Sequence, residues 1–582
     1  MKLNKKKIIL ASILIFLLIL GWWLVKLVWF KPTSINLFYE RTLIGYALKD
    51  PQQMSKLGVL NSFGIKFFDD KLTDRSLEHE LDLFRYSERE LNILRSYDRS
   101  KQTKEQLIST DILDWFMENY GKGKEFMHYG FPVNNYLGVQ KQLPEFMVNS
   151  HTIHGKKDAK NYIKRLSVFD TYFTQTIDSL KAQEQKGIIP PSYVISNTLT
   201  AMNNFISQSA EDNSLYTVFV DKLKGLKLDD DTKTRLTQDV KAEIENTVYP
   251  SYKRLINYYD GLLEKSKDYV GVYNLPEGEK YFRYMLRNYA TLDITPEEAY
   301  NKLTSEVDKI NSEIRRLGKK TITSENETGA ISTLDDCQKV ISDMYSKLPM
   351  LFGTLPKAKV QVQYYPDTGS TNSGFFQYNS SDMNGTKPAT IFVPKDFASN
   401  NSYTMKWILY HEGVPGHHLQ QALAREMKNI PNFRKIIGFS AFSEGWATYA
   451  QSIPWEYRIT SDPNGEVEML KTKLMHIGRA VIDIGVNYMR WTREDAIKYA
   501  LENKICDEGS ARFYSEYCTV YPGIECTYAI GYLKIIELRD EARAKLRNKF
   551  SIKDFHDAIL EDGEMPLSLL EKKIKEYIDI KK

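Results

Sequence analysis

Apolar residues recur along most of the chain with the period of an α-helix. The segment that begins at Thr295 is the clearest example, because its apolar side chains fall three or four residues apart and form one continuous stripe. Thr295 and Glu298 match a capping box, and Pro296 suits the first helical position. Comparable patterns predict helices over about 75–120, 156–186, 232–266, 332–349, 402–426, 466–490, 493–503, 523–546 and 565–581.

A period of two replaces the helical period in one region. Val360, Val362 and Tyr364 alternate with polar residues, which is typical of a half-buried strand, and Thr390 to Val393 form a second short candidate. We expect these strands to form a small sheet just before the helical segment 402–426, with one edge facing a cleft. An extended peptide can bind along such an edge through backbone hydrogen bonds. A purely structural hairpin is an equally good interpretation of the pattern.

The N-terminus has the pattern of a membrane segment. Four lysines lie within the first seven residues, and an apolar run follows from Ile8 to Val25 and continues past Lys26 to Phe30. A helix over Ile8–Val25 would be about 27 Å long, which is close to the hydrocarbon thickness of a bilayer. We therefore predict one transmembrane anchor over residues 1–30, with the N-terminus in the cytoplasm and the bulk of the chain, from about Lys31, on the extracytoplasmic side. An unusually long cleaved signal is the alternative, and it too would export the bulk of the chain.

Composition narrows the possibilities for the rest of the chain. No linker or low-complexity tract interrupts residues 31–582, so we predict one large domain with an N-terminal helical part at about 60–320 and a second part at about 350–582. The net charge is only +4 and its charges are interspersed, so nothing indicates binding to nucleic acid. Four cysteines exclude a disulfide scaffold, although Cys518 and Cys526 are compatible either with one bridge or with buried free thiols. The sequence does not determine the oligomeric state.

Three of the nine histidines gather within eight residues. His411, His417 and His418 flank Glu412, and apolar residues on both sides place this cluster inside buried helical structure. Each buried histidine needs a hydrogen-bonding partner, so a core has no structural reason to collect three of them. The cluster therefore predicts a metal site, with a polar network that holds no metal as the alternative.

The spacing of these histidines departs from the His-Glu-x-x-His pattern of zinc peptidases. On an unbroken helix, His411 and His417 would point about 120° apart. His411 and His418 would share a face, but they would be separated by roughly 10.5 Å along the axis. Pro415 and Gly416 allow the helix to break between them, so that His417 can return to His411. We prefer His417 over His418 as the second ligand, which leaves His418 free to contact substrate or a transition-state oxygen.

A carboxylate completes the predicted metal site. Glu444 lies in a segment that reads as a buried helix, where a carboxylate is costly unless it meets a cation. Two histidines and one glutamate are a typical ligand set for a catalytic zinc, so we expect one Zn²⁺ per chain, although the same set suits several other divalent ions. A salt bridge between Glu444 and an arginine is the less specific interpretation.

These motifs resemble a known bacterial family. The sequence is similar to the domain of unknown function 885 family, which is usually grouped with gluzincin-type metallopeptidases, over residues from about 65 to the end. The matching motifs are His411-Glu412 with Pro415-Gly416-His417-His418, Glu444-Gly445-Trp446, Asp483-x-Gly485 leading to Trp491, Tyr521-Pro522-Gly523 with Tyr528 and Gly531, and, upstream, Phe131 to Asn134, Leu137-Gly138 and Tyr284 to Arg287.

The resemblance implies a mostly helical, zinc-peptidase-like fold with a deep cleft, similar to the thimet oligopeptidase and carboxypeptidase Taq families. It also implies Glu412 as the general base and Tyr528 as a donor to the oxyanion, although Tyr528 is equally consistent with an ordinary buried tyrosine. Three positions depart from the usual pattern of the family, namely Ile524, Asn487 and Gln451.

The sequence as a whole therefore predicts a membrane-anchored zinc peptidase that hydrolyses short peptides. Two alternatives remain open. One is another amide hydrolase, for instance one that acts on cell-wall peptides, which would use the same site residues. The other is a non-catalytic surface scaffold derived from such an enzyme, which the three departures favour and the intact Glu412 opposes.

Overall fold

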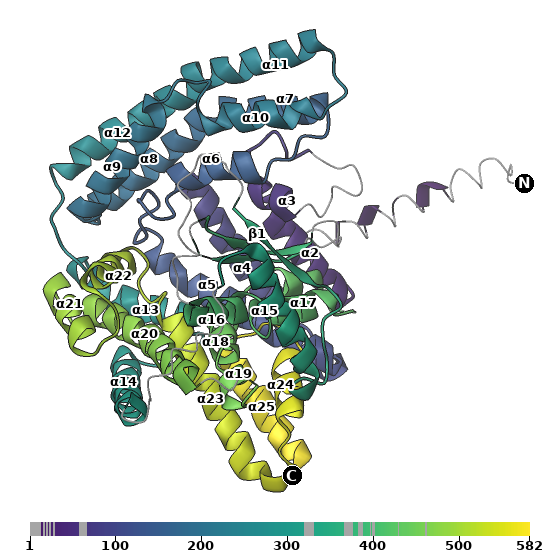
Figure 1. Cartoon of the computed structure of the whole chain (residues 1–582). Coiled ribbons are helices and arrows are strands. Elements are labelled where there is room, and N and C mark those ends of the chain that lie inside the picture. The colour runs from purple at the N-terminus through teal and green to yellow at the C-terminus, as the bar shows by residue number, and fades with distance from the viewer. Residues whose placement is uncertain are drawn as a thin grey trace, which may run out of the picture.

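A computed structural model gives the structure of the chain (Figure 1). It describes residues 13–15, 18, 21–22, 25–26, 30–57, 67–318, 331–365, 376–381, 388–395, 397, 402–428, 430–459 and 463–582.

Helices make up most of the described chain, so the prediction of a mostly helical fold is confirmed. The helices before the sheet are α2 (Ile35–Leu48), α3 (Pro51–Leu57), α4 (Leu77–Arg95), α5 (Lys104–Lys122), α6 (Val139–Asn149), α7 (Lys156–Ser167), α8 (Phe169–Gln185), α9 (Ser192–Ser207), α10 (Ser214–Lys224), α11 (Asp230–Glu243), α12 (Tyr249–Leu263), α13 (Gly278–Ala290), α14 (Pro296–Gly318) and α15 (Leu334–Lys347). Those after it are α16 (Ser402–Glu412), α17 (His417–Glu426), α18 (Ser440–Ala450), α19 (Ile453–Glu456), α20 (Pro463–Asn487), α21 (Arg493–Glu502), α22 (Glu508–Val520), α23 (Cys526–Leu546), α24 (Ile552–Leu560) and α25 (Leu567–Lys581).

Local sequence signals set several of these boundaries. The capping box predicted at the start of α14 is present, because Thr295 Oγ1 accepts from the backbone N–H of Glu298 while the Glu298 carboxylate accepts from that of Thr295. The long helix predicted over 75–120 is in fact two helices, α4 and α5. A second capping box, in which Thr103 pairs with Gln106, starts the second of them.

The predicted small sheet is also present, with one more strand than expected. It contains β1 (Val360–Tyr364), β2 (Gln377–Asn379) and β3 (Ala389–Val393), in the order β1-β3-β2. The two predicted strands, β1 and β3, are parallel neighbours, so they do not form a hairpin. Strand β2 was not predicted, because three residues are too few to show a period. It lies antiparallel to β3 and forms one edge of the sheet.

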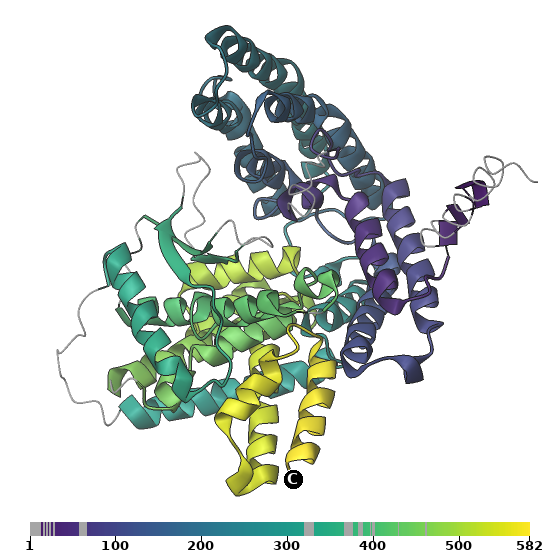
Figure 2. The ribbon, with the colours of Figure 1, turned by 90° about the vertical axis from the view of Figure 1, so that its right-hand side faces the viewer.

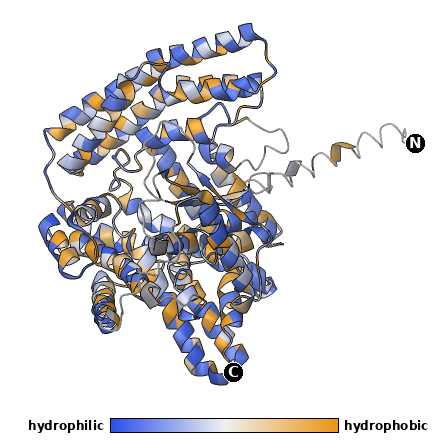
Figure 3. Cartoon of the chain, viewed as in Figure 1, coloured by the Kyte–Doolittle hydropathy of each residue, from blue (hydrophilic) through white to orange (hydrophobic). Residues whose placement is uncertain are grey.

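Two hydrophobic cores divide the described helices. One core lies wholly within residues 133–262, and Figures 1 and 2 show α6 to α12 as a lobe above the rest of the molecule. The second and larger core unites α2, α4, α5 and α13 to α25 with the sheet. Apolar and polar positions alternate along most helices in Figure 3, as expected for helices with one buried face. All the predicted site residues belong to the body that contains the second core.

Two further predictions concern the N-terminal anchor and the cysteines. No helix in the part of the chain that the structure describes is long and apolar enough to cross a membrane. Most of the predicted anchor over residues 1–30 lies outside the described residues. Cys518 and Cys526 are both buried free thiols, so the alternative without a bridge is correct.

Candidate metal centre

The helical segment 402–426 breaks where the sequence suggested. Helix α16 ends at Glu412 and α17 begins at His417, with a turn between them whose Gly416 N–H donates to Tyr410 O at 2.9 Å. A side chain at Gly416 would collide with the carbonyl oxygen of His411, so only glycine allows the chain to pass this close. The indole N–H of Trp446 donates to Pro415 O at 3.0 Å and fixes the turn against α18.

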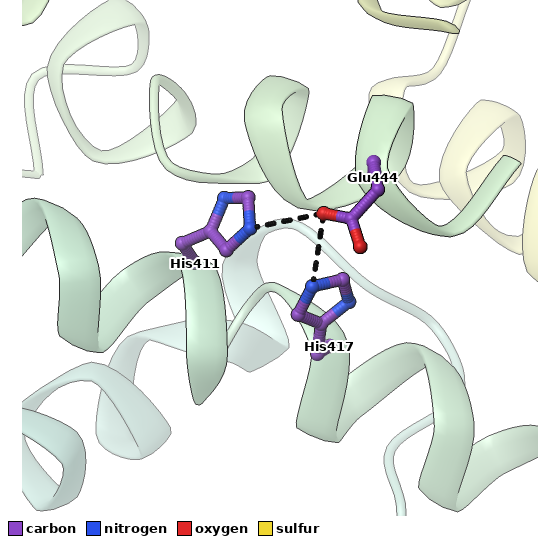
Figure 4. Close-up of side chains that lie close together, drawn as sticks. All are labelled: His411, His417 and Glu444. Atoms are coloured by element: carbon purple, nitrogen blue, oxygen red, sulfur yellow. Dashed lines mark ion pairs between the residues drawn. The ribbon is translucent and has the colours of Figure 1, made fainter. Parts of the chain in front are cut away.

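This break brings three of the predicted ligands together (Figure 4). Nε2 of His411 and Nε2 of His417 each lie 3.4 Å from Oε2 of Glu444. The three ligand atoms all lie within 4.8 Å of one another. Atoms bound at about 2.0–2.2 Å to a tetrahedral zinc are about 3.3–3.6 Å apart, so the two measured separations fit that ion. The residue types and these two separations make the triad a candidate metal site.

Each histidine of this triad is oriented through its other ring nitrogen. Nδ1 of His411 lies 3.2 Å from Oε1 of Gln451, and Nδ1 of His417 lies 3.3 Å from Oγ of Ser443. An Nδ1–H that donates to such an oxygen leaves Nε2 with its lone pair directed at the metal position. Gln451, one of the three departures from the family pattern, therefore supplies an acceptor for His411.

The charges of the triad depend on one another. Burial opposes ionisation of Glu444, but the adjacent His417 and His411 outweigh it and hold the pKa of the carboxyl well below its ordinary value. Burial likewise opposes the charge on His417, but Glu444 and Glu412 raise its pKa to about 9. A metal ion that binds here must therefore displace a proton from His417.

Glu412 lies beside the triad and is held by the sheet. Its Oε2 accepts a hydrogen bond from the backbone N–H of Tyr378 in β2 at 2.9 Å. Burial raises the pKa of Glu412, against the opposing effect of His417 and His411. A carboxylate with a raised pKa next to a metal position is suited to accept a proton from water.

His418 does not join the triad, because it follows His417 on α17 and points about 100° away from it. It is fully buried, and its Nε2 lies 3.0 Å from Ala358 O while its Nδ1 lies 3.1 Å from the hydroxyl of Tyr378. With Nε2–H donating to the carbonyl and Nδ1 accepting from the hydroxyl, both ring nitrogens are engaged. His418 therefore ties α17 to the sheet, and the structure gives no nitrogen of it to a substrate.

Tyr528 in α23 faces the triad. Its ring lies 6.3 Å from that of His411, and the interplanar angle is 23°. The negative charge of Glu444, together with burial, raises the pKa of Tyr528 well above its ordinary value, so the hydroxyl keeps its proton. Tyr528 is therefore a neutral donor beside the metal position.

A family model described as "Bacterial protein of unknown function (DUF885)" matches residues 51–574. The chain belongs to this family. The match covers almost all of the predicted large domain and every site residue named above. No curated protein matches the chain.

Two solved structures share the DUF885 fold seen here. One is a "putative lipoprotein" from Colwellia psychrerythraea, with a TM-score of 0.87 and 24% identity over 94% of this chain and 98% of that one. The other is a "putative lipoprotein of unknown function" from Shewanella oneidensis, with a TM-score of 0.71 and 14% identity over 93% of this chain and 99% of that one. At these identities the likeness establishes the fold alone.

One residue of the DUF885 site, His476 in α20, was not predicted from the sequence. Its ring stacks on that of Tyr528 at 5.2 Å and lies 6.1 Å from that of His411, with an interplanar angle of 12° in both cases. His476 is buried, and its Nδ1 has no hydrogen-bond partner. The only sequence signal was its position seven residues before Asp483, which places both on one face of a helix.

Asp483 and Asn487 build the turn that leads to Tyr528. Asp483 accepts from the backbone N–H groups of Gly523 at 2.9 Å and Glu525 at 3.0 Å, directly before α23. The amide of Asn487 donates to Asp483 and to Cys518 O, and its oxygen accepts from the backbone of Val272. Asn487, one of the three departures from the family pattern, thus forms its own hydrogen bonds, and these help to hold the turn that precedes Tyr528.

Two hollows lie near the metal centre. The smaller, of about 330 Å³, is lined by Glu444 itself and by residues of α17, α18 and the segment 434–440. The larger, of about 940 Å³, lies mainly between α2, α4, α5, α8 and the segment 127–139, and no member of the triad lines it. Both hollows are lined by Ile436 and Ile437, which places the larger one next to the smaller.

Proposed function

We propose that this DUF885 protein is a zinc-dependent peptidase that hydrolyses short peptides. One observation carries the proposal, which is the convergence of His411, His417 and Glu444 in zinc-ligand geometry beside the carboxylate of Glu412. The orientation of His411 by Gln451 and of His417 by Ser443 supports the proposal. Metal-binding histidines are typically held in this way through the second ring nitrogen.

The residues of the chain have distinct roles in this reaction. When bound, zinc supplies Lewis acidity and lowers the pKa of a water. Glu412 accepts a proton from the attacking water and passes it to the nitrogen of the leaving amine. Tyr528 donates its hydroxyl proton in a hydrogen bond to the oxygen that becomes negative as the carbonyl is attacked. Burial of the site strengthens both interactions by excluding bulk water.

A peptide is the substrate that the surroundings of the site favour. Strand β2 is an edge strand whose Tyr378 N–H already reaches Glu412, so an extended chain at this edge would lie beside the general base. The two hollows, of about 330 Å³ and about 940 Å³, each fall within the range of about 300–1,000 Å³ that is typical of small-molecule sites, which favours short peptides over folded proteins. Another amide hydrolase, acting on cell-wall peptides, would use the same residues.

We also propose that residues 1–30 anchor residues 31–582 in a membrane, with the metal centre on the extracytoplasmic side. The basic and then apolar pattern of the N-terminus supports this arrangement. The description of both structural relatives as lipoproteins is consistent with export.

Metal content tests the site directly. The chain, purified without added metal, is expected to contain one zinc, which is lost in His417→Ala and in Glu444→Ala and kept in His418→Ala. His418→Ala is the matched control, because it removes the neighbouring imidazole. A chain that binds no zinc even when zinc is supplied, or a His417→Ala variant that keeps it, would overturn the proposal.

The base is tested in a second variant. Glu412→Gln is expected to retain zinc and to lose nearly all hydrolysis of a peptide library followed by mass spectrometry, because the amide cannot accept the proton. Full activity in this variant would contradict the role of Glu412 while leaving the metal centre intact.

A further inference from the structure

The smaller hollow lies beside the proposed metal position. Glu444 and Ser443 of α18 form one wall, Arg425 of α17 lies in a second, and Arg434 and Lys435 lie in a third. Its volume of about 330 Å³ is near the lower limit of about 300 Å³ for small-ligand sites. It can therefore hold a short terminal part of a peptide next to the metal position, and not a long stretch of one.

Arg434 is the most unusual member of this lining. Only 6% of it is exposed, and its guanidinium donates to the hydroxyl of Ser109 and to the backbone carbonyl of Asp562. Its Nε–H is buried and has no partner. Among the described residues no carboxylate forms an ion pair with it. A buried charge in this state is costly, and an anion would relieve the cost.

Other arginines that are buried as deeply are paired. Arg165 has a carboxylate oxygen of Asp69 at 3.8 Å, and Arg539 has one of Glu456 at 2.6 Å. Both lie in the packed interior away from the hollow. Arg434 differs from them because it forms no ion pair with a described carboxylate, although the charge of Asp562 acts on it electrostatically. It also lines a hollow, where an anion can bind.

Both carboxylates in the lining already have partners within the protein. Glu444 faces His411 and His417. Glu564 accepts hydrogen bonds from the backbone N–H of Phe439 at 2.9 Å and from the side-chain amide of Gln420 at 3.1 Å. Arg434 and Lys435 also line the hollow, and its lining contains no third carboxylate.

We propose that this hollow binds the α-carboxylate of a peptide, with Arg434 as its main partner, so that the enzyme cleaves near the free C-terminus of its substrate. The inference rests on the proposed function, because it places the scissile bond at the metal centre. Hydrolysis breaks one C–N bond. The hydroxyl of water goes to the acyl carbon and its proton to the leaving amine, so a short C-terminal fragment is released from the hollow.

Binding to the zinc-loaded Glu412→Gln variant tests this without turnover. The probe is a fluorescein-labelled pentapeptide library that lacks Asp and Glu, prepared as the free acid and as the C-terminal amide, and read by fluorescence anisotropy. The free acid is expected to bind about tenfold or more tightly, because only it offers an anion to the buried arginine. Equal binding of the two forms would overturn the proposal.

A third library distinguishes the α-carboxylate from a side-chain carboxylate. It is amidated but has Glu as its last residue, and it is expected to bind like the plain amide. If it binds as tightly as the free acid, the hollow recognises an acidic side chain and the assignment to the C-terminus is wrong.

Two variants in the Glu412→Gln background assign the effect to Arg434. Arg434→Met is expected to remove the advantage of the free acid and to leave binding of the amide unchanged. Lys428→Met changes an exposed residue that follows α17 and does not line the hollow, and this variant is expected to keep the advantage. An advantage that survives in a folded Arg434→Met would overturn the role of Arg434. If that variant does not fold, the comparison of acid and amide on the unaltered hollow still decides the proposal.

The outcomes also separate the two proposals of function. Cleavage of acid and amide peptides at equal rates by the unaltered enzyme would leave the peptidase intact and remove the carboxylate site. Preferential binding of the free acid without any cleavage would support the carboxylate site and contradict the proposed peptidase activity.

Discussion

Gln451 and Ser443 contact His411 and His417, so they would act on a bound metal only through these two histidines. Replacing Gln451 by Met keeps the size of the side chain and removes the acceptor for His411. We expect zinc affinity, measured by competition with a chromophoric chelator, to fall about 10–100-fold. Gln451→Glu restores an acceptor and is expected to keep or raise the affinity. Unchanged affinity in Gln451→Met would show that the ring of His411 is held by packing alone.

His476 offers a second test at the level of a single residue. His476→Phe keeps an aromatic ring against Tyr528 and removes both ring nitrogens. We expect zinc content to stay at that of the unaltered chain while kcat/KM falls about tenfold or more, because a potential donor beside the reacting oxygen is lost. The effect should not add to that of Tyr528→Phe if both serve the same oxygen. A loss of zinc in His476→Phe would instead indicate that the ring supports His411.

At the next scale, the packing of α18 on α23 sets the geometry of the centre. Gly445 lies directly against Gly531, and a side chain on either glycine would collide with the backbone of the facing helix. Glu444 precedes Gly445, and Tyr528 lies one turn before Gly531. Both functional side chains therefore depend on a helix separation that only glycine permits.

Gly445→Ala is accordingly expected to separate the helices. We predict that it lowers the free energy of unfolding by about 1–3 kcal/mol through overpacking and weakens zinc binding as Glu444 shifts. Gly261→Ala is the matched control, because Gly261 lies in α12 with open space around its Cα. It should leave zinc binding unchanged and stabilise the chain by about 0.5–1 kcal/mol. Urea denaturation and zinc titration of both variants would measure the difference.

Periodicity revealed those elements that are long and amphipathic. The helices α14, α15, α20, α21 and α23 appear within a few residues of their predicted positions, as do strands β1 and β3. Short elements such as α24 and β2 offer too few repeats to show a period. The helix break at Gly416 was predictable because Pro and Gly are rare within helices, and it is the reason why the sequence favoured His417 over His418 as a ligand. His476 was not predictable, because its partners come from α16 and α23 and only tertiary packing brings them together.

At the scale of the whole molecule, each of the two cores buries a histidine in a neutral state. His151 lies in the upper lobe, where burial and the adjacent Arg165 lower its pKa to about 3. His556 lies in the lower body, fully buried between Tyr449 and Leu351, and burial lowers its pKa to about 3 as well. Neither can accept a proton without losing native hydrogen bonds.

These two histidines predict how stability depends on pH. Their pKa in the unfolded chain is about 6.5, so below that pH the unfolded state binds more protons than the native state. Their contribution is therefore complete above about pH 6.5 and is lost as the pH falls toward 3. We expect the free energy of unfolding in urea to decline below pH 6.5, and to decline less in His151→Gln and His556→Gln. His154→Gln, which removes a histidine at an exposed position, is the control.

The contact between α18 and α23 has a consequence for how the protein would acquire its metal. The proposed ligands His411, His417 and Glu444 all precede α23 in the sequence, and α18, which carries Glu444, packs closely against α23. A chain that stops before residue 526 would contain every ligand and still fail to retain zinc. The ion would therefore enter late in folding, and its retention would distinguish finished molecules from truncated ones.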